Sequence, residues 1–477
     1  MSLRTGAQYL ESLKDGREVW LEGDRVADVT SDPRLAGCAR SVAEVYDLQH
    51  DPSYRDVLTM NLDSAGEPVS VAYLIPRSTD DLVRHRLMVE CLMRRCGGTM
   101  GRLPEYSAAM LQGLYHARDI LGQGDPAYPG RAERYIEHCR DNDLCLATGF
   151  TDPPRDRTRP AEEWERLHVV KRGPDGIVVR GAKAVSTMAP YANEFQCLTS
   201  HRPDLRPEEV LYFAVPMATP GLRIICRQPF AHQSREEHPL SAAFDEMDAW
   251  IILEDVFVPT ERVHFLDRVD LNQPLFAALP VPLVNFHILI RQAVKAEVLA
   301  GLCVAIAEYL GLTSQPNAQN AMQALLGYLT TLRAFLFAAE QQPIYSPSGQ
   351  AIANPTIVNQ GRIHAMENHV TMLHMVREIC GASLLMTPRL ADLRHPEIGP
   401  AMRRYIAGTD DLSMERYHLM KLAWDYLGDA FGSRQLMFEL HNAGTLDMTK
   451  LRFVSAYDKA PLVKLAKELA GIPAGKT

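Results

Sequence analysis

The spacing of apolar residues changes twice along this chain, and that change constrains the fold more than any other feature of the sequence. Over roughly the first 140 residues, apolar side chains recur every three or four positions, which predicts helices. Between about 144 and 265, short β-like runs and turn residues replace that spacing, and Gly173-Pro174-Asp175-Gly176 predicts a hairpin. The helical spacing then returns in long segments at 283–312, 318–341, 357–380 and 412–431.

Further strands are expected at 194–198, 210–215, 222–226 and 249–253, enough for a small antiparallel barrel or sandwich. We therefore predict an α+β protein with an N-terminal mainly helical domain (1–143), a middle β domain (144–270) and a C-terminal four-helix bundle (271–477). A chain of 477 residues exceeds the usual limit for one core and can enclose a large cofactor. The order of the three parts is the layout of the acyl-CoA dehydrogenase-like fold.

Composition argues against several kinds of partner. The net charge is -9 and Lys and Arg form no block, so we expect no nucleic-acid partner. The N-terminus does not resemble a secretory signal, and no run approaches the roughly 18 apolar residues of a membrane span. The nine cysteines are odd in number and none of their spacings is CxxC. We expect a cytoplasmic protein with reduced thiols, no membrane partner and no metal site.

Six blocks of sequence occur in a characteristic order along nearly the whole chain. They are the opening Thr5-Gly6-Ala7-Gln8-Tyr9-Leu10, Met100-Gly101-Arg102-Leu103-Pro104-Glu105-Tyr106, Asp152-Pro153-Pro154-Arg155-Asp156-Arg157, Gly181-Ala182-Lys183-Ala184-Val185-Ser186-Thr187, Phe244-Asp245-Glu246-Met247-Asp248-Ala249, and Lys421-Leu422-Ala423-Trp424-Asp425 with Phe431-Gly432-Ser433-Arg434. Together these blocks resemble the 4-hydroxyphenylacetate 3-hydroxylase family.

The resemblance implies an FADH2-dependent monooxygenase. Members of that family take reduced FAD from a separate NAD(P)H-dependent flavin reductase, form a C4a-hydroperoxide with molecular oxygen, and transfer one oxygen atom to an aromatic, phenol-like substrate. The chain has no GxGxxG motif after a strand, which agrees with a separate source of reducing equivalents. The resemblance also implies a homodimer or homotetramer.

Arg102 and Tyr106 are the leading candidates for substrate binding and catalysis. They flank Pro104, and a proline in the first turn of a helix places both side chains near the helix start. By resemblance they match the family's substrate-binding Arg and Tyr, where the guanidinium would favour a phenolate. Thr199 and Ser200 match positions that touch substrate in relatives.

Further residues match flavin contacts of the family. The resemblance implies FAD contacts from the stretch Pro154, Arg155, Asp156 and Arg157, from Thr187, and from Asn442, Ala443, Gly444 and Thr445. Arg157 and Arg434 could offset pyrophosphate charge. An ordinary ion pair is the alternative for both arginines.

Thr148 departs from the family pattern, because the family carries a histidine there beside the substrate hydroxyl. A threonine cannot act as a base near neutral pH, although it can still donate and accept a hydrogen bond. We therefore keep Thr148 as a catalytic and cofactor-binding candidate and consider three outcomes. Arg102 and Tyr106 suffice, or His287 enters the substrate site, or the same flavin chemistry acts on a nitrogen or on a carrier-tethered substrate in natural-product biosynthesis. A hydrogen-bonded core histidine is the alternative for His287.

Two rival functions follow from the same motifs. The 4-hydroxybutyryl-CoA dehydratases hold FAD beside an iron-sulfur cluster, using a CxxxC pair, a histidine and a cysteine seven residues after it. Here four residues separate Cys91 from Cys96, and Val294 occupies the position seven residues after His287, so that ligand set is incomplete. The other rival is a flavin-binding protein without catalysis, suggested by Thr148 alone.

Overall fold

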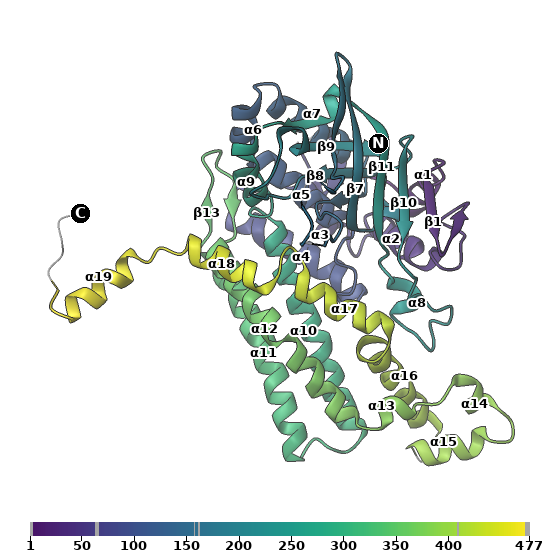
Figure 1. The fold of residues 1–477 in the computed structure, drawn as a ribbon. Coiled ribbons are helices and arrows are strands. Elements are labelled where there is room, and N and C mark those ends of the chain that lie inside the picture. The colour runs from purple at the N-terminus through teal and green to yellow at the C-terminus, as the bar shows by residue number, and fades with distance from the viewer. Residues whose placement is uncertain (1–2, 63–65, 157, 161–162, 408–409, 473–477) are drawn as a thin grey trace.

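The structure is a computed structural model that describes residues 3–62, 66–156, 158–160, 163–407 and 410–472. Helices and two β-sheets form the body of the molecule, and long helices extend away from it (Figure 1). The predicted α+β architecture, with the acyl-CoA dehydrogenase-like order of helices, sheet and bundle, is confirmed.

The N-terminal part is mainly helical, as the apolar spacing predicts. Its helices are α1 (Gly6–Ser12), α2 (Ala36–Leu48), α3 (Arg55–Leu58), α4 (Thr79–Arg95), α5 (Pro104–His116), α6 (Arg118–Gly124) and α7 (Tyr128–Asp141). Capping boxes at Thr5 and Ser78 start α1 and α4, because each side chain accepts a hydrogen bond from the backbone three residues later. Short strands β1 (Glu18–Leu21), β2 (Asp24–Val26), β3 (Thr59–Asn61) and β4 (Pro68–Ser70) interrupt the helices.

The middle part contributes most of two sheets. Its strands are β5 (Leu146–Gly149), β6 (His168–Gly173), β7 (Gly176–Thr187), β8 (Glu194–Leu198), β9 (Leu211–Pro216), β10 (Leu222–Cys226), β11 (Asp248–Pro259) and β12 (Val263–Leu266), with the short helix α8 (Ser241–Phe244) before β11. The first sheet has the order β2-β1-β10-β11-β7-β6 and the second β12-β9-β8-β5. The predicted hairpin joins β6 to β7, with Gly173 opposite Gly176.

Two features of the sheets differ from the sequence prediction. The pairs β1–β10 and β5–β8 are parallel, so the middle part is not purely antiparallel. Strands β1 and β2 belong to the N-terminal segment by sequence but complete the first sheet. Pairing between strands about 200 residues apart leaves no local signal in the sequence.

The C-terminal part is built on long helices. They are α9 (Val269–Ala278), α10 (Val284–Tyr309), α11 (Pro316–Gln341), α12 (Pro355–Cys380), α13 (Ser383–Met386), α14 (Leu390–Arg394), α15 (Gly399–Ala407), α16 (Asp410–Leu427), α17 (Ala430–His441), α18 (Leu446–Ala456) and α19 (Ala460–Leu469), with a small hairpin of β13 (Ile344–Tyr345) and β14 (Ala351–Ile352). Helices α10, α11 and α12 pack against one another, and α16 packs against α10 and α12. The predicted bundle is present.

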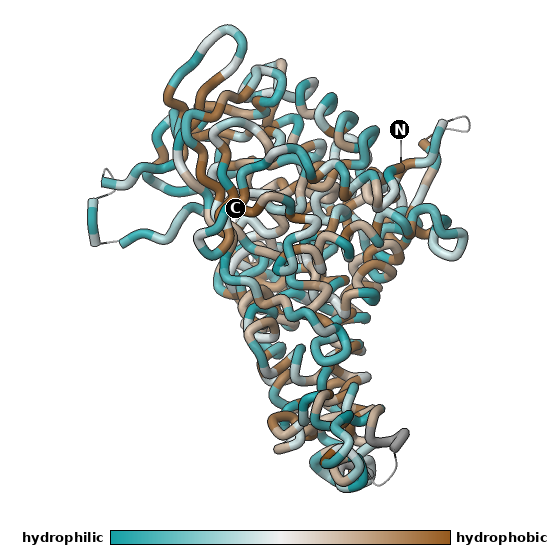
Figure 2. The backbone as a smooth tube through the Cα atoms, turned by 90° about the vertical axis from the view of Figure 1, so that its right-hand side faces the viewer, coloured by the Kyte–Doolittle hydropathy of each residue, from teal (hydrophilic) through white to brown (hydrophobic). Residues whose placement is uncertain are grey.

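Hydrophobic residues follow the strands, hydrophobic and hydrophilic residues alternate along the helices, and hydrophilic residues mark the projecting loops (Figure 2). Helix α11 is long and apolar enough to cross a membrane by those two criteria alone, although polar residues such as Gln323 and Arg333 interrupt its apolar residues. Because α11 packs against both α10 and α12, we interpret it as a helix of the bundle. The last helix, α19, projects away from the body and buries none of its residues (Figure 1).

Candidate active site

The start of α5 meets the end of α17 through Arg102. Pro104 occupies the first turn of α5, as predicted, and Arg102 lies just before it. The Arg102 guanidinium stacks 3.8 Å from the centre of the Tyr106 ring and donates to Asn442 Oδ1 at 2.6 Å. Gly101 permits this approach, because a Cβ there would lie 2.5 Å from the Phe438 ring. Two predicted site residues and one predicted cofactor residue are therefore in direct contact.

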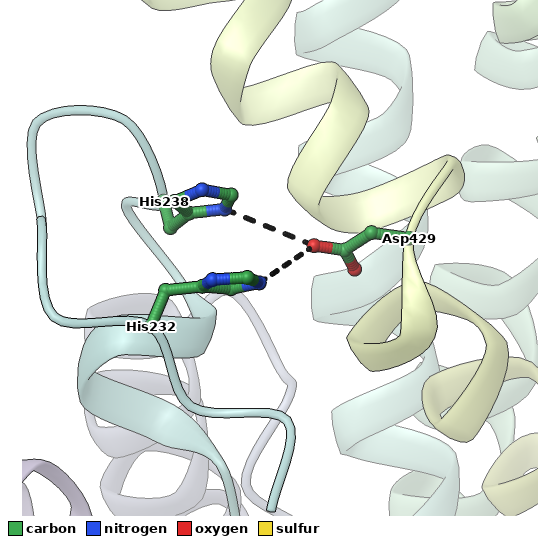
Figure 3. A group of neighbouring side chains, drawn as sticks. All are labelled: His232, His238 and Asp429. Carbon is green, nitrogen blue, oxygen red and sulfur yellow. Dashed lines mark ion pairs between the residues drawn. The ribbon is translucent and has the colours of Figure 1, made fainter.

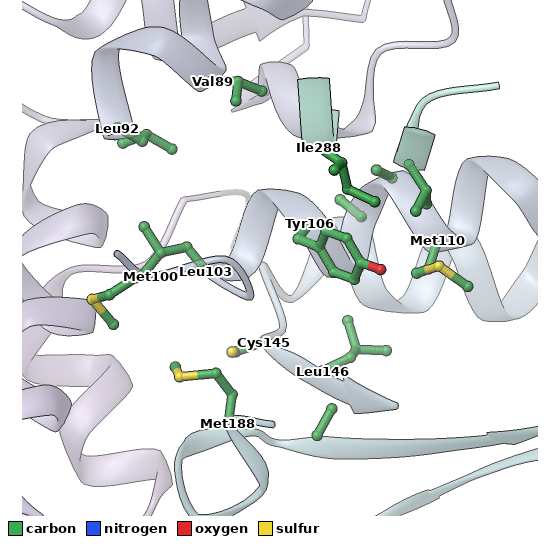
Figure 4. Close-up of a cluster of buried hydrophobic side chains, with 14 of the residues drawn as sticks. Val89, Leu92, Met100, Leu103, Tyr106, Met110, Cys145, Leu146, Met188 and Ile288 are labelled. Carbon is green, nitrogen blue, oxygen red and sulfur yellow. The ribbon is translucent and has the colours of Figure 1, made fainter. Parts of the chain in front are cut away.

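Tyr106 presents a hydroxyl that has no partner in the described part of the chain. Its ring is buried among apolar side chains, including Met110, Leu146 and Ile288 (Figure 4). The edge of the ring meets His287, with ring centres 5.3 Å apart and planes at 76°. A tyrosine in an apolar cluster normally directs its hydroxyl at a polar partner, so this hydroxyl is available to a ligand.

His287 lies at the start of α10, inside the same cluster. Its Nε2 is 3.1 Å from Glu105 Oε1, and both side chains are buried. Burial raises the pKa of Glu105 to about 8, and burial together with Arg291 and Arg102 lowers the pKa of His287 well below its usual value. Both groups are therefore neutral near pH 7. Nδ1 of His287 is buried and has no partner among the described residues.

Arg362, on α12, supplies a second cation that sequence reasoning missed. Its buried guanidinium donates to Asn285 Oδ1 at 2.7 Å and to the Asn442 carbonyl at 3.1 Å, and no described carboxylate pairs with it. Burial, with Arg452 nearby, lowers its pKa to about 10, so it stays charged at neutral pH. Arg362 Nε and Asn442 Nδ2 are buried without partners. Unpaired donors around two guanidiniums favour an anionic ligand.

A buried network connects Thr187 to Arg102. The Thr187 hydroxyl donates to Asp248 Oδ1 at 2.7 Å, and Arg434 donates to Asp248 at 2.8 and 2.9 Å and to Glu246 at 3.1 Å. Glu246 in turn accepts the backbone N–H of Arg102. Burial alone would raise the pKa of Asp248, but Arg434 holds it below its usual range. For Arg434 the structure thus shows the ion pair, the second of the two interpretations given above.

Thr148, Thr199 and Ser200 lie on the second sheet or directly after its strand β8. Thr148 is half-buried on β5, opposite Gln196 of β8, and its hydroxyl has no partner within the described residues. The hydroxyls of Thr199 and Ser200 donate to the backbone carbonyls of Glu209 and Phe150. Helix α5 packs on β5, where Ser107 accepts the backbone N–H of Leu146, so Thr148 lies on the strand next to the Tyr106 helix.

The two segments predicted to contact FAD occupy different places. Pro154 and Asp156 are exposed, and Arg155 lies 3.7 Å from Asp204 in an ion pair. Arg157 falls outside the described residues. The segment from Asn442 to Thr445 links α17 to α18, with Ala443 and Gly444 at positive φ and Thr445 capping α18. This second segment lies beside Arg102, through Asn442, and no hydrogen bond or ion pair between described residues joins it to residues 154–156.

The ligand set of an iron-sulfur dehydratase is not assembled. Cys91 and Cys96 are free thiols. Within the described ranges, only one group of three or more His, Cys, Asp or Glu side chains is close enough to share a metal ion. It consists of His232, His238 and Asp429 and contains no cysteine. That group was not foreseen from the sequence.

Comparison with known proteins agrees with the sequence blocks. Profiles described as the 4-hydroxyphenylacetate 3-hydroxylase N terminal and C terminal match residues 5–265 and 278–471. A 4-nitrophenol 4-monooxygenase/4-nitrocatechol 2-monooxygenase oxygenase component from Rhodococcus opacus is 32% identical over 98% of this chain and 91% of its own. A (3S)-3-amino-3-(3-chloro-4-hydroxyphenyl)propanoyl-[peptidyl-carrier protein SgcC2] monooxygenase from Streptomyces globisporus is 31% identical over 94% and 86%.

Among solved structures, the oxygenase component of 4-hydroxyphenylacetate 3-monooxygenase complexed with FAD is similar with a TM-score of 0.92 and 30% identity, over 98% of both chains. Both halves of this chain therefore match one family in sequence, and the whole chain matches it in fold. The chain belongs to the 4-hydroxyphenylacetate 3-hydroxylase family.

Proposed function

We propose that this chain is the oxygenase component of a two-component flavin monooxygenase that hydroxylates a phenol with reduced FAD and molecular oxygen. The main evidence is the Tyr106 hydroxyl, which has no partner among the described residues and lies beside Arg102 and His287. The positive charge of this buried cluster comes from Arg102 and Arg362. The reaction consumes the phenol, one O2 and FADH2, and yields the hydroxylated phenol, water and oxidised FAD. A separate NAD(P)H-dependent reductase supplies the reduced flavin.

The residues present fit a flavin between the β part and the bundle. Bound reduced FAD would activate O2 and deliver one oxygen atom to the substrate. Thr148 offers an unpartnered hydroxyl on β5, and Thr187 is held in one orientation by Asp248 at the end of β7. We propose that these two threonines contact the flavin. The similar solved structure is complexed with FAD, which supports FAD as the cofactor.

We propose that the substrate binds as a phenolate. Arg102 and Arg362 stabilise the negative oxygen, and the Tyr106 hydroxyl donates to it. If His287 donates from Nε2 to neutral Glu105, its Nδ1 keeps a lone pair that can accept the phenol proton. His287 then supplies the base that Thr148 cannot, which is the second of the three outcomes considered from sequence.

The low basicity of buried His287 favours phenols that ionise easily. The Rhodococcus opacus relative is named for 4-nitrophenol and 4-nitrocatechol, which are acidic phenols, and this supports a substrate with an electron-withdrawing ring substituent. The second candidate is a carrier-tethered aryl substrate, favoured by the Streptomyces globisporus relative. A nitrogen substrate has no support from an observed contact.

We further propose a cytoplasmic homodimer or homotetramer. The nine cysteines are free thiols, as a reducing compartment requires. Leu462, Leu465 and Leu469 of α19 are more than half exposed, and Phe337 on α11 is 66% exposed. Apolar faces of this kind are usually covered by another protein surface, and a second copy of the chain would cover them.

The test is a single turnover. The protein is mixed anaerobically with chemically reduced FAD and 4-nitrophenol and then exposed to 18O2, with oxidised FAD as the control. We expect one labelled oxygen atom in the product and little hydrogen peroxide. Complete reoxidation of the reduced flavin with all of the O2 consumed released as hydrogen peroxide, and no label in the 4-nitrophenol product, would contradict a hydroxylase.

A further inference from the structure

A second cluster of chemically active side chains lies away from Arg102, where the segment between β10 and α8 meets the start of α17. His232 and His238 come from that segment, and Asp429 lies just before α17 (Figure 3). The two imidazoles stack with ring centres 3.6 Å apart and planes at 13°. Both rings direct a nitrogen at the same oxygen of Asp429 (Figure 3).

The three donor atoms have the separations that one metal ion requires. His232 Nε2 lies 3.6 Å and His238 Nδ1 3.8 Å from Asp429 Oδ2, and all three atoms are within 4.8 Å of one another. Metal–ligand bonds of about 2.0 to 2.2 Å place two ligands of one tetrahedral zinc ion roughly 3.4 Å apart. The observed gaps are too long for hydrogen bonds, and the two stacked rings would turn on binding so that both in-plane lone pairs point at one ion.

The donor atoms make no hydrogen bond to the residues that the structure describes, although the side chains themselves are held. Asp429 Oδ1 accepts the backbone N–H groups of Phe431 and Gly432 at 2.9 and 3.2 Å, which leaves Oδ2 free. Oδ2 of Asp429 and Nδ1 of His238 are both buried without a hydrogen bond in the part of the chain that the structure describes. Unsatisfied buried polar atoms that face one another are characteristic of a ligand site.

A neighbouring carboxylate adds negative charge. Asp425 is fully buried and is fixed by the backbone N–H groups of Leu240 and Ser241 at 2.7 and 2.8 Å. Its Oδ1 lies 3.7 Å from His238 Nδ1. A divalent cation held by Asp429 and the two imidazoles would offset both carboxylates. His232 is 46% exposed, so the cation can enter from solvent.

We propose that His232, His238 and Asp429 form a binding site for a divalent transition-metal ion of the zinc type, which ties the β10–α8 segment to α17. Two imidazole nitrogens and one carboxylate oxygen suit zinc, whereas magnesium and calcium prefer oxygen ligands alone. Helix α17 leads from Asp429 to Asn442 beside Arg102, so the ion would fix one end of the helix whose other end borders the substrate cluster. This site does not depend on the proposed hydroxylase function.

Zinc binding to the full-length protein after EDTA treatment and dialysis tests the proposal, measured by competition with a chromophoric chelator and by metal analysis. His232→Ala removes one exposed ligand. Asp429→Asn removes the ligand oxygen but keeps the helix cap, because asparagine caps helices as well as aspartate does. His374→Ala is the matched control, since His374 is exposed and lies 3.3 Å from Glu378 without a third ligand.

We expect one tightly bound zinc ion per chain and a melting temperature that rises with zinc concentration. Zinc affinity should be at least about tenfold weaker in both site variants, because even the loss of a residue that only hydrogen-bonds a metal ligand lowers affinity by about that factor. The control variant keeps wild-type zinc affinity, and magnesium does not change the melting temperature. Cobalt in the site shows no thiolate-to-metal band, which separates it from binding at cysteines. Absence of tight zinc in the wild-type protein, or wild-type affinity in either site variant, overturns the proposal.

Discussion

Replacing Tyr106 with phenylalanine removes one oxygen atom from the candidate active site and keeps the ring that Arg102 and His287 contact. The hydroxyl has no hydrogen-bond partner within the described residues, so its removal leaves no buried group of the protein newly unpaired. We therefore expect the free energy of unfolding to change by less than about 0.5 kcal/mol. The catalytic effect is different, because a hydrogen bond to a charged group contributes about 1.5 to 3 kcal/mol. At roughly 1.4 kcal/mol per tenfold, kcat/KM should fall about 10- to 150-fold.

The assay measures the hydroxylated product from 4-nitrophenol with an independent flavin reductase, and urea unfolding in parallel. Tyr73→Phe is the matched control, because the buried Tyr73 hydroxyl already donates to the Cys139 carbonyl at 3.1 Å and is therefore not available to a substrate. That variant should lose about 1 kcal/mol of stability and keep its activity. If Tyr106→Phe retains kcat/KM within twofold, or if both variants lose stability equally, the assignment of Tyr106 to the substrate is wrong.

Three further changes test the electrostatics. Asp248→Asn removes one of the two carboxylates that pair with buried Arg434 and should lower the free energy of unfolding by about 3 to 5 kcal/mol, whereas Asp255→Asn at an exposed pair should cost under about 1 kcal/mol in the same urea titration. The pKa of Glu105 is raised to about 8, so between about pH 4.5 and 8 the folded protein holds a proton that the unfolded chain has lost, and the free energy of unfolding falls as pH rises. In a series of melting temperatures against pH, Glu105→Gln should lack that part of the fall. Identical slopes of melting temperature against pH in the variant and the wild type would refute the raised pKa. Arg362→Met should weaken 4-nitrophenolate binding, measured by absorbance titration, about tenfold or more, and should cost about 1 to 3 kcal/mol of stability because Asn285 Oδ1 and the Asn442 carbonyl lose their donor; unchanged affinity would remove Arg362 from the site.

Local patterns predicted most of the fold. The apolar spacing located α10, α11 and α12 to within a few residues, and β8 lies at 194–198 as predicted, because each segment carries its own period and turn signals. Pro104 correctly predicted the start of α5. The parallel pairing of β1 with β10 was missed, since it depends on contacts between distant segments.

Only part of the candidate site could be predicted from the sequence. Resemblance pointed to Arg102 and Tyr106, but nothing in the sequence indicated that Arg434 would pair with Asp248, 186 residues away. Arg362 lies among buried positions of α12, where a lone arginine carries no recognisable motif. The cluster around Asp429 draws its members from two segments without a metal-binding spacing, and for that reason no metal site was expected.

The hydrogen-bonded path from Thr187 through Asp248, Arg434 and Glu246 to Arg102 has a consequence for protein engineering. Substitutions at the proposed substrate contact Arg102 and substitutions at the proposed flavin contact Thr187 act on one connected set of charges. Their effects should not add, because residues in a shared network typically show coupling energies of about 0.5 to 3 kcal/mol. A library that varies one end alone would therefore miss combinations that work only when both ends change.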